Sequence, residues 1–567
     1  MKVFGVAACT PIGWTDCGDG FEKDPSGWGC REVLADVCSG ATRAALGSPT
    51  CVPIGDCSAP FPPANARLFV SAAGATDATH FRSLYAAALA SRTGDIIAVD
   101  TGVYRESAQF DRAVTVVGRC AEKVIFDGTG LTTTGLISVA PTTVRGLTVR
   151  KFPVAVDVSA GLVLEDSVLE DNEDIGIYAE GTAITAKVAR SVIRNTIAAS
   201  MATAFGIDLA KGTTMDIVDT EITKSQGAGI IVTPGSKVNI ATSVIRDSTG
   251  DRQGLGGYGL NGQGGDATIV NSAFINNADT GVRAYKNGTL TVERTVIRGT
   301  RPGDRGRGYG LVASTGSTLT ASKVTITGTV GVGIVCESST ATVTDSVVRA
   351  QVSAPDGDFG DGVYVFNGGS LTLGHVALID NARSGANVFD AKTEATFDHV
   401  LLSGTKPLPA GDMGLGVAIA FGAHAKIDST VIINHHHTGI YVFEGGTLDL
   451  TKSAIRETAL QLMRQPLGHG ILATDSKRIV ITGSEIRKSA GIGVAFANTA
   501  AVISQSVIAD NAVGIHVQDG STLVQVDTAP TDPSGLSVDV TADTKFEGNA
   551  TRVGSGTVPL PDPLPKL

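Results

Sequence analysis

The sequence predicts an all-β solenoid, a chain that winds into a stack of coils, and three observations support this fold class. Short β-branched and aliphatic runs are separated by Gly and Asn corners. A glycine opens such a run at a regular interval over most of the chain. After each glycine, inward and outward positions alternate with a period of two, as in Ile177, Tyr178 and Ala179. This period indicates strands rather than helices.

The strand-opening glycines set the length of one coil. They span 338 residues over thirteen intervals, so one coil takes about 26 residues, a period typical of solenoids. The intervals alternate between 21–24 and 29–31 residues, except that the last two are both short. The glycines are Gly176, Gly206, Gly229, Gly259, Gly281, Gly310, Gly333, Gly362, Gly385, Gly416, Gly439, Gly470, Gly493 and Gly514.

The longer intervals contain a Gly-rich insert. Residues 295–312 read TVIRGTRPGDRGRGYGLV, and residues 243–260 and 346–364 repeat the pattern. Each copy has Ser or Thr, any residue, an aliphatic residue and Arg, followed by an insert that holds Gly-Asp and by the next strand. The repeating unit is therefore a pair of coils, and the inserts are expected to form a ridge on alternate coils.

Residues 1–63 are predicted to form a small cysteine-rich head that ends in a Pro-rich linker. Six of the eight cysteines lie in the first 57 residues, a density typical of disulfide frameworks in an oxidising compartment. Spacing alone leaves fifteen pairings open if all six close. A zinc knuckle is the alternative, although paired Cys-x-x-Cys spacing is missing. The cysteines expected in disulfides are Cys17, Cys30, Cys38, Cys51 and Cys57.

Cys9 is predicted to have a different role. The run VAAC that ends at Cys9 resembles the lipobox at which bacterial lipoproteins are cut and acylated, and the start MKVFGVAAC is too short for a complete signal peptide. We therefore expect a shortened leader, a lipid anchor on Cys9, and a secreted or outer-surface location. The sequence holds no run of about 20 apolar residues, which a membrane-spanning helix needs.

The coils are expected over residues 64–545, beginning with a strand at 68–70 and a capping helix at 77–92. An open solenoid end exposes its core and unpaired strand edges, so a covering helix is expected there. The apolar residues at helical spacing are Phe81, Leu84, Tyr85, Ala88 and Leu89. Residues 546–567 end in VPLPDPLPKL and are expected to form a C-terminal cap and tail, because proline stops strand pairing.

A family resemblance begins in the run from Gly94 to Gly118. This run contains GDIIAV, GVYRE and VTVVG, which resemble the opening of right-handed parallel β-helix proteins of the pectin-lyase-like superfamily. The resemblance covers residues 67–545 and implies a right-handed parallel β-helix. The superfamily includes lyases, hydrolases, epimerases, adhesins and inert scaffolds, so the resemblance does not define an activity.

The net charge of the chain limits the classes of partner that it can bind. The net charge of −11 provides no basic surface for nucleic acid. Outward arginines nevertheless recur on the insert-bearing coils, and the inserts supply aspartates. We expect an ion-pair ladder between the two sets, and a track that binds a polyanion through arginine is the alternative. The residues are Arg246, Arg298, Arg349, Asp251, Asp304 and Asp358.

Aromatic residues at outward positions predict a carbohydrate-binding strip. Strict alternation from Val363 and Ile440 places the rings outside the coil. Exposed rings in a row are suited to stacking on sugar faces. The alternative is that inserts or a partner chain fold over them. The residues are Tyr364, Phe366, Phe389, Tyr441 and Phe443.

No catalytic residue, metal site or cofactor is predicted. The run Gly468-His469-Gly470 resembles the Gly-His-Gly motif of polygalacturonases, but the paired aspartates that such hydrolases need are not visible nearby. Asp356, Asp358 and Asp361 could hold Ca²⁺, although solvated turn residues explain them better. Residues 435–437 are three histidines expected at an exposed corner, where consecutive side chains point apart.

Three functions are compatible with these patterns. The first is a non-catalytic module that binds a polysaccharide or another cell-envelope partner. The second is an extracellular polysaccharide lyase or glycoside hydrolase, and the third is a structural spacer. Regular repeats favour binding or spacing, because catalysis needs a few irreplaceable groups in one place. The patterns give no indication of the oligomeric state.

Overall fold

The computed structural model describes residues 9–199, 202–409, 411, 413–460, 467–554 and 556–559. It divides into two compact units. The N-terminal unit comprises Asp16–Asp24 and Cys30–Arg305, and the C-terminal unit comprises Met1–Thr15, Pro25–Gly29 and Gly306–Leu567. Both units are built mainly of short parallel strands, so the predicted solenoid of strands is confirmed.

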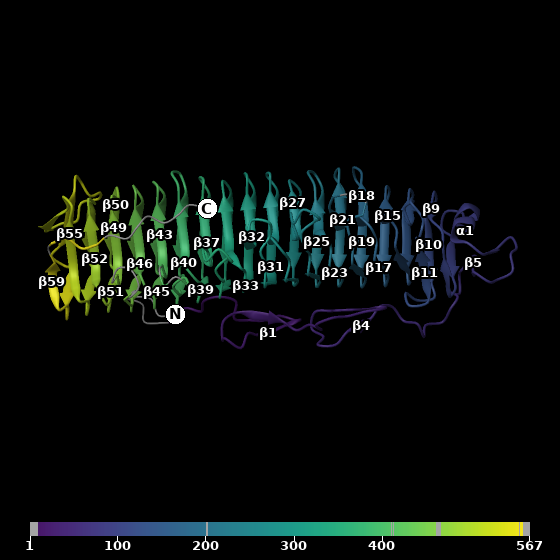
Figure 1. Cartoon of the computed structure of the whole chain (residues 1–567), viewed down its shortest axis with the longest axis horizontal. Helices are drawn as coiled ribbons and strands as arrows, with labels where there is room; N and C mark the ends of the chain where they lie inside the picture. Colours follow the sequence, from purple (N-terminus) through teal and green to yellow (C-terminus); the bar gives the residue numbers. More distant parts are fainter. Residues whose placement is uncertain are drawn as a thin grey trace. The chain divides into compact units, whose positions relative to one another are not determined.

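The strands of the N-terminal unit form three stacks, in which each strand pairs in parallel with its equivalent in the next coil (Figure 1). The glycine stack comprises β9 (Ala108–Phe110), β12 (Leu136–Ser138), β15 (Val154–Val158), β18 (Ile175–Glu180), β21 (Ala204–Ala210), β24 (Gly227–Val232), β27 (Tyr258–Gln263) and β30 (Thr280–Tyr285). The middle stack comprises β5 (Leu68–Val70), β7 (Ile96–Val99), β10 (Val114–Gly118), β13 (Thr142–Arg145), β16 (Leu162–Glu165), β19 (Thr185–Ala189), β22 (Thr214–Val218), β25 (Lys237–Ala241) and β28 (Asp266–Val270). The arginine stack comprises β8 (Gly102–Tyr104), β11 (Val124–Asp127), β14 (Thr148–Arg150), β17 (Val168–Glu170), β20 (Val192–Arg194), β23 (Glu221–Thr223), β26 (Val244–Arg246) and β29 (Ala273–Ile275), and β31 (Thr289–Arg298) runs through both of the last two stacks.

The C-terminal unit has the same three stacks. Its glycine stack comprises β32 (Gly308–Ser314), β34 (Gly331–Glu337), β37 (Asp361–Phe366), β40 (Ser384–Phe389), β43 (Leu415–Ala420), β46 (Thr438–Phe443), β49 (His469–Thr474), β52 (Ile492–Ala497), β55 (Val513–Gln518) and β59 (Thr551–Gly554). Its middle stack comprises β33 (Thr318–Thr327), β35 (Thr340–Thr344), β38 (Ser370–Gly374), β41 (Glu394–Asp398), β44 (His424–Asp428), β47 (Thr447–Thr451), β50 (Arg478–Thr482), β53 (Ala501–Ser504), β57 (Ser537–Thr541) and β56 (Thr522–Val526). Its arginine stack comprises β36 (Val347–Arg349), β39 (Ala377–Ile379), β42 (Leu401–Ser403), β45 (Val431–Ile433), β48 (Ala454–Arg456), β51 (Glu485–Arg487), β54 (Val507–Ala509) and β58 (Lys545–Glu547), and β33 also pairs with β36.

Close packing explains the column of strand-opening glycines. At Gly206, an added Cβ would lie 2.6 Å from the carbonyl oxygen of Gly229 and 2.8 Å from Cγ2 of Ile222. The φ angle of Gly206 lies outside the left-handed region, so the neighbouring coil, rather than an unusual backbone angle, requires glycine here. Inward Val, Ile, Leu and Ala side chains of all three stacks fill the interior of each unit.

The capping helix is shorter than the predicted span of 77–92. Helix α1 covers Leu84–Ala90, and the Ser83 hydroxyl caps it by accepting a hydrogen bond from the Ala86 N–H. The residues before it are not helical, because His80–Phe81 forms strand β6 against β5. The exposed fractions of Tyr85 and Leu89 are 51% and 55%, so the predicted apolar face is wrong at these two positions. No helix among the described residues is long and apolar enough to cross a membrane.

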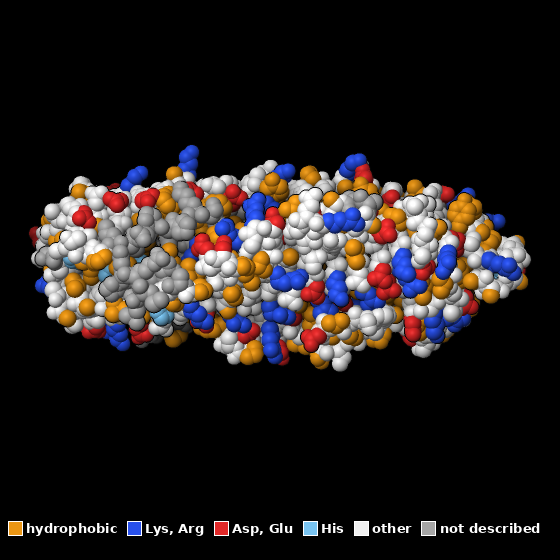
Figure 2. All heavy atoms as spheres, viewed as in Figure 1, with side chains coloured by type: hydrophobic (Ala, Val, Ile, Leu, Met, Phe, Trp, Pro, Cys, Tyr) orange, Lys and Arg blue, Asp and Glu red, His pale blue; other side chains and the backbone are white. Residues whose placement is uncertain are grey.

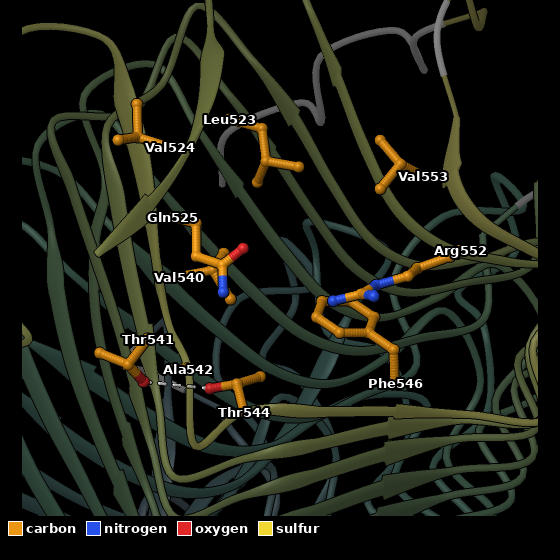
Figure 3. A pocket seen from close by; sticks show the side chains of 10 residues that line it. All are labelled: Leu523, Val524, Gln525, Val540, Thr541, Ala542, Thr544, Phe546, Arg552 and Val553. Atoms are coloured by element: carbon orange, nitrogen blue, oxygen red, sulfur yellow. Dashed lines mark hydrogen bonds between the residues drawn. The ribbon is translucent and has the colours of Figure 1, made fainter. Parts of the chain in front are cut away.

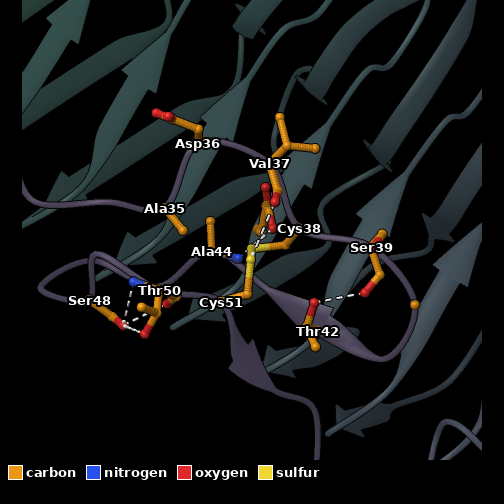
Figure 4. The surroundings of a disulfide bond; sticks show 12 residues. Ala35, Asp36, Val37, Cys38, Ser39, Thr42, Ala44, Ser48, Thr50 and Cys51 are labelled. Atoms are coloured by element: carbon orange, nitrogen blue, oxygen red, sulfur yellow. Dashed lines mark hydrogen bonds between the residues drawn. A yellow bond between two sulfur atoms is a disulfide. The ribbon is translucent and has the colours of Figure 1, made fainter.

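The head contains two short hairpins and is held by disulfides. Strand β1 (Phe21–Lys23) pairs with β2 (Cys30–Glu32), and β3 (Thr42–Arg43) pairs with β4 (Val52–Pro53). All five cysteines expected in disulfides form them, as Cys17–Cys30, Cys38–Cys51 (Figure 4) and Cys57–Cys120. The third bond ties the end of the head to the first coils of the N-terminal unit. Cys9 is exposed and Cys336 is buried, and both are free thiols.

Candidate functional site on the glycine stack

The arginine column has a structural role that differs from the predicted ladder. Arg246 lies 2.6 Å from the Glu221 carboxylate and donates to the backbone carbonyls of Ala35 and Asp36 in the head. Arg298 likewise lies 2.5 Å from Glu32 of the head. The predicted pairing of the arginines with the insert aspartates is therefore wrong for these two residues.

The insert aspartates do not pair with the arginines in the predicted way. The Asp251 carboxylate accepts hydrogen bonds from the N–H groups of its own insert, at Gln253 and Leu255. Asp304 is exposed, and Asp358 contacts Arg383 at 2.7 Å instead of pairing with Arg349. The sequence did not reveal the partners of Arg246 and Arg298, because the head residues that bind them lie 210 and 266 positions away in the chain.

The predicted aromatic strip is wrong in its exposure. The side chains of Tyr364, Phe389, Tyr441 and Phe443 are at most 3% exposed, and Phe366 is half-buried. They form one apolar cluster on the outside of the coil, with Phe359 of an insert packed among them. The centroid of the Phe389 ring lies 5.4 Å from that of Tyr364 and 6.0 Å from that of Phe443. The four buried rings pack against one another and present no open face on which a sugar could stack, and only Phe366 remains partly accessible.

The same outward position carries polar groups in the N-terminal unit. Counting two residues after each strand-opening glycine gives Tyr178, Asp208, Ile231, Asn261 and Arg283, and Asp157 precedes them in register. Strand partners in adjacent coils are about 4.8 Å apart, so these side chains form a straight column on the outer face of the glycine stack. We call Asp157, Tyr178, Asp208, Asn261 and Arg283 the polar column.

Electrostatics distinguish Asp208 within this column. Burial, together with the nearby Glu180 carboxylate, raises the pKa of Asp208 to about 6. Burial also raises the pKa of Asp157 above its ordinary value. Glu180 behaves differently: Lys211 and the Tyr178 hydroxyl both bind its carboxylate and lower its pKa. The column therefore contains a carboxyl group whose pKa lies close to neutral pH.

The other end of the column combines a cation with aromatic rings. The guanidinium carbon of Arg283 lies 4.4 Å from the centroid of the Tyr285 ring, and the Lys286 ammonium lies 5.0 Å from it. Tyr258, Tyr178 and Tyr285 are all half-buried and keep part of each ring accessible. On the face drawn in Figure 2, basic and acidic side chains are interspersed over the N-terminal unit rather than gathered into a patch of one sign.

Three polar atoms of the column have no partner. Among the described residues, nothing accepts from Nε of Arg283 or donates to Oδ1 of Asp208 and Oδ1 of Asn261, although all three atoms are buried from solvent. A buried polar atom without a hydrogen bond costs free energy, and native proteins leave few of them. The column therefore combines unmet hydrogen-bonding capacity with two side chains, Asp208 and Arg283, that remain partly exposed on the outer face. Sequence analysis missed it, although these residues interrupt a position that is mostly apolar after Gly310.

Comparison with known families identifies the fold. A family model described as "Right handed beta helix region" matches residues 176–348, 229–402 and 361–550, which together cover more than half of the chain. The chain belongs to this right-handed β-helix family. The right-handed parallel β-helix that the sequence predicted is thereby confirmed. Among the described residues of this β-helix protein, no group of His, Cys, Asp and Glu side chains is arranged to hold a metal ion.

Solved structures similar to this β-helix protein include three carbohydrate-active enzymes. The catalytic unit of a thermostable GH87 α-1,3-glucanase from Streptomyces thermodiastaticus strain HF3-3 is 14% identical, with 87% of this chain and 71% of that chain covered and a TM-score of 0.21. The PL6 family alginate lyase AlyGC is 10% identical, with 82% and 95% covered and a TM-score of 0.18. The A-module of the Azotobacter vinelandii mannuronan C-5 epimerase AlgE4 is 11% identical, with 82% and 91% covered and a TM-score of 0.14. Likeness at this level carries no argument about activity, and no curated protein matches the chain in sequence.

Proposed function

We propose that this protein is an extracytoplasmic module that binds a polysaccharide along the polar column of its N-terminal unit. The observation that carries the proposal is the set of three unpartnered polar atoms on Asp208, Asn261 and Arg283, all in one column. Carboxylate, amide and guanidinium groups bind sugar hydroxyls, and the adjacent tyrosine rings supply apolar faces. One pyranose ring is about as long as the spacing between coils, so a chain of sugars lying along the column repeats its contacts coil by coil.

A second candidate function is hydrolysis or elimination at the same column, and the raised pKa of Asp208 favours it. A carboxyl group with a pKa near the working pH is suited to general acid or general base catalysis. Binding remains the preferred function, because the neighbouring Glu180 carboxylate is already bound by Lys211 and by the Tyr178 hydroxyl, which lower its pKa, and is not free to serve as the second acid or base.

Binding is tested with purified protein and a panel of neutral and acidic polysaccharides. We expect Asn261→Ala and Arg283→Gln each to weaken retention of the bound member by about tenfold or more, because each removes a hydrogen bond made in a desolvated site. Asp304→Asn is the matched control, since Asp304 is an exposed residue of an insert, and it should bind like the wild type. Binding should also change between pH 5 and pH 7 and lose that dependence in Asp208→Asn, because the pKa of Asp208 is about 6.

The same panel separates the alternatives. Release of reducing ends or unsaturated uronates that Asp208→Asn abolishes would establish the catalytic function instead. If no polysaccharide is retained or cleaved, the polar column does not bind glycans and the protein acts as a spacer. Circular dichroism spectra show whether each variant is folded, so that a loss of folding is not mistaken for a loss of binding.

The extracytoplasmic location rests on the three disulfides, which persist in oxidising compartments. A lipid anchor on Cys9 extends this proposal. Cys9 is exposed and forms no disulfide, as an acylated cysteine must. We expect mass spectrometry of the protein from its native membrane fraction to find Cys9 modified by diacylglycerol. An unmodified Cys9 thiol in that fraction would rule the anchor out, without affecting the glycan site.

A further inference from the structure

The last coil of the C-terminal unit ends in a strand with a free edge. Strand β57 pairs with β53 on one side, and β56 pairs with the other side of β57, although β56 precedes β57 in the chain. Among the described residues, β56 has no other partner strand. The N–H and C=O groups along one edge of β56 therefore point away from the coil without strand partners. An edge of this kind is a template for pairing with another strand.

The side chains of β56 do nothing to prevent such pairing. Its sequence, TLVQV over residues 522–526, has no charge and no proline, and Val524 at its centre is 39% exposed. Proteins usually protect edge strands with charged residues, proline or bulges. The neighbouring terminal strands do so, since β58 carries Lys545 and Glu547 and β59 carries Arg552. The contrast marks β56 as the unprotected edge of this coil.

A cavity of about 320 Å³ opens beside β56. Figure 3 shows Leu523 of β56, Phe546 of β58 and Val553 of β59 around it, and the Arg552 guanidinium stacks 4.9 Å from the Phe546 ring centroid. Val553 is 44% exposed. Apolar side chains of three strands are thus accessible at the same end as the free edge, so a partner that pairs with β56 also covers apolar surface.

We propose that β56 pairs with β56 of a second copy of this chain in antiparallel register. A pairing centred on Val524 places Val524 opposite its own equivalent, Leu523 opposite Gln525, and Thr522 opposite Val526. The first residue beyond the strand, Asp527, then lies opposite Ser521, so no like charges face each other despite the net charge of −11. The contact is self-complementary and closes after two copies, as an isologous dimer does. This inference is independent of the glycan site.

The test is sedimentation equilibrium of the full chain together with the variant Val524→Lys. We expect the wild type to form a reversible dimer. The dissociation constant of the dimer should be at least tenfold higher for Val524→Lys, because two ammonium groups would then face each other at the centre of the contact. Leu255→Lys is the matched control, since Leu255 is 45% exposed on an insert of the N-terminal unit, and it should dimerise like the wild type. A wild-type chain that stays monomeric at every concentration overturns the proposal.

Cross-linking tests the register. In a Cys9→Ser background, Val524→Cys should form a covalent dimer on mild oxidation, whereas Thr522→Cys should not, because residue 522 faces residue 526. Equal cross-linking of both variants overturns the antiparallel pairing. The variants lie on a terminal strand, and unchanged melting temperatures establish that each is folded.

Discussion

Lowering the pH from 7 to 4 is expected to destabilise the C-terminal unit selectively. Burial lowers the pKa of His435, His437 and His469 to about 4 in the folded protein. Unfolded histidine has a pKa of about 6.5, so the unfolded chain gains these protons first as the pH falls. Stability is therefore lost between pH 6.5 and pH 4, at about 3 kcal/mol for each histidine. The expectation that this corner is exposed is wrong, since His435 and His437 are 0% and 6% exposed.

Hydrogen exchange of peptides from each unit measures this effect between pH 4 and pH 7, after correction for intrinsic rates. The N-terminal unit should keep its protection in this range, because the raised pKa of Asp208 has the opposite effect. The folded protein binds the Asp208 proton more tightly than the unfolded chain does, so stability rises as the pH falls from 6 towards 4. His469→Asn is the informative variant. In the wild type, the Nδ1 atom of His469 accepts a hydrogen bond from the Ile492 N–H. The asparagine side chain can also accept this hydrogen bond but does not titrate, so the variant should be less sensitive to acid. Simultaneous loss of protection in both units would contradict the role of the histidines.

Phe389→Ala is expected to lower the free energy of unfolding by about 3–5 kcal/mol, a typical cost of deleting a buried aromatic ring. Phe389 is 1% exposed, and its ring contacts those of Tyr364, Phe421 and Phe443 in the outer cluster. Urea unfolding followed by circular dichroism measures the change. Tyr85→Ala provides the control, because that ring is 51% exposed and its removal should cost little.

The comparison of the two variants tests how much the buried ring contributes to stability. If Phe389→Ala unfolds at the same urea concentration as Tyr85→Ala, packing of the Phe389 ring does not stabilise the unit. A large loss for Phe389→Ala alone supports the covered cluster.

Periodicity was sufficient to predict the coils but not what lies over them. The alternation after Gly362 correctly places Val363 inside and Tyr364 outside the coil, because strand geometry is local. Whether an outward ring is exposed depends on inserts such as the one that contributes Phe359, and no local rule fixes how an insert folds back. The disulfide of Cys57 with Cys120 was not predicted either, because Cys120 lies outside the cysteine-rich head, 63 residues after Cys57.

The arginine column shows the same limit. Its positions were predicted correctly on alternate coils, yet Arg246 and Arg298 bind the head rather than the inserts. The head consists of short hairpins, and its sequence has no periodicity from which the stack that it contacts could be predicted. The polar column was missed for a different reason. Its residues had to be compared at one position across many coils, and a single Asp or Asn at an outward position is ordinary in the sequence of a strand.

The glycine column restricts how such a protein changes over evolution. Because an added Cβ at Gly206 would lie 2.6 Å from the backbone of the next coil, a larger residue at this position would push neighbouring coils apart. Substitutions in the glycine column are therefore costly, whereas outward positions and inserts are free of this constraint. New specificity is expected to arise on the outside of the coils, through exchanges at outward positions and in the inserts.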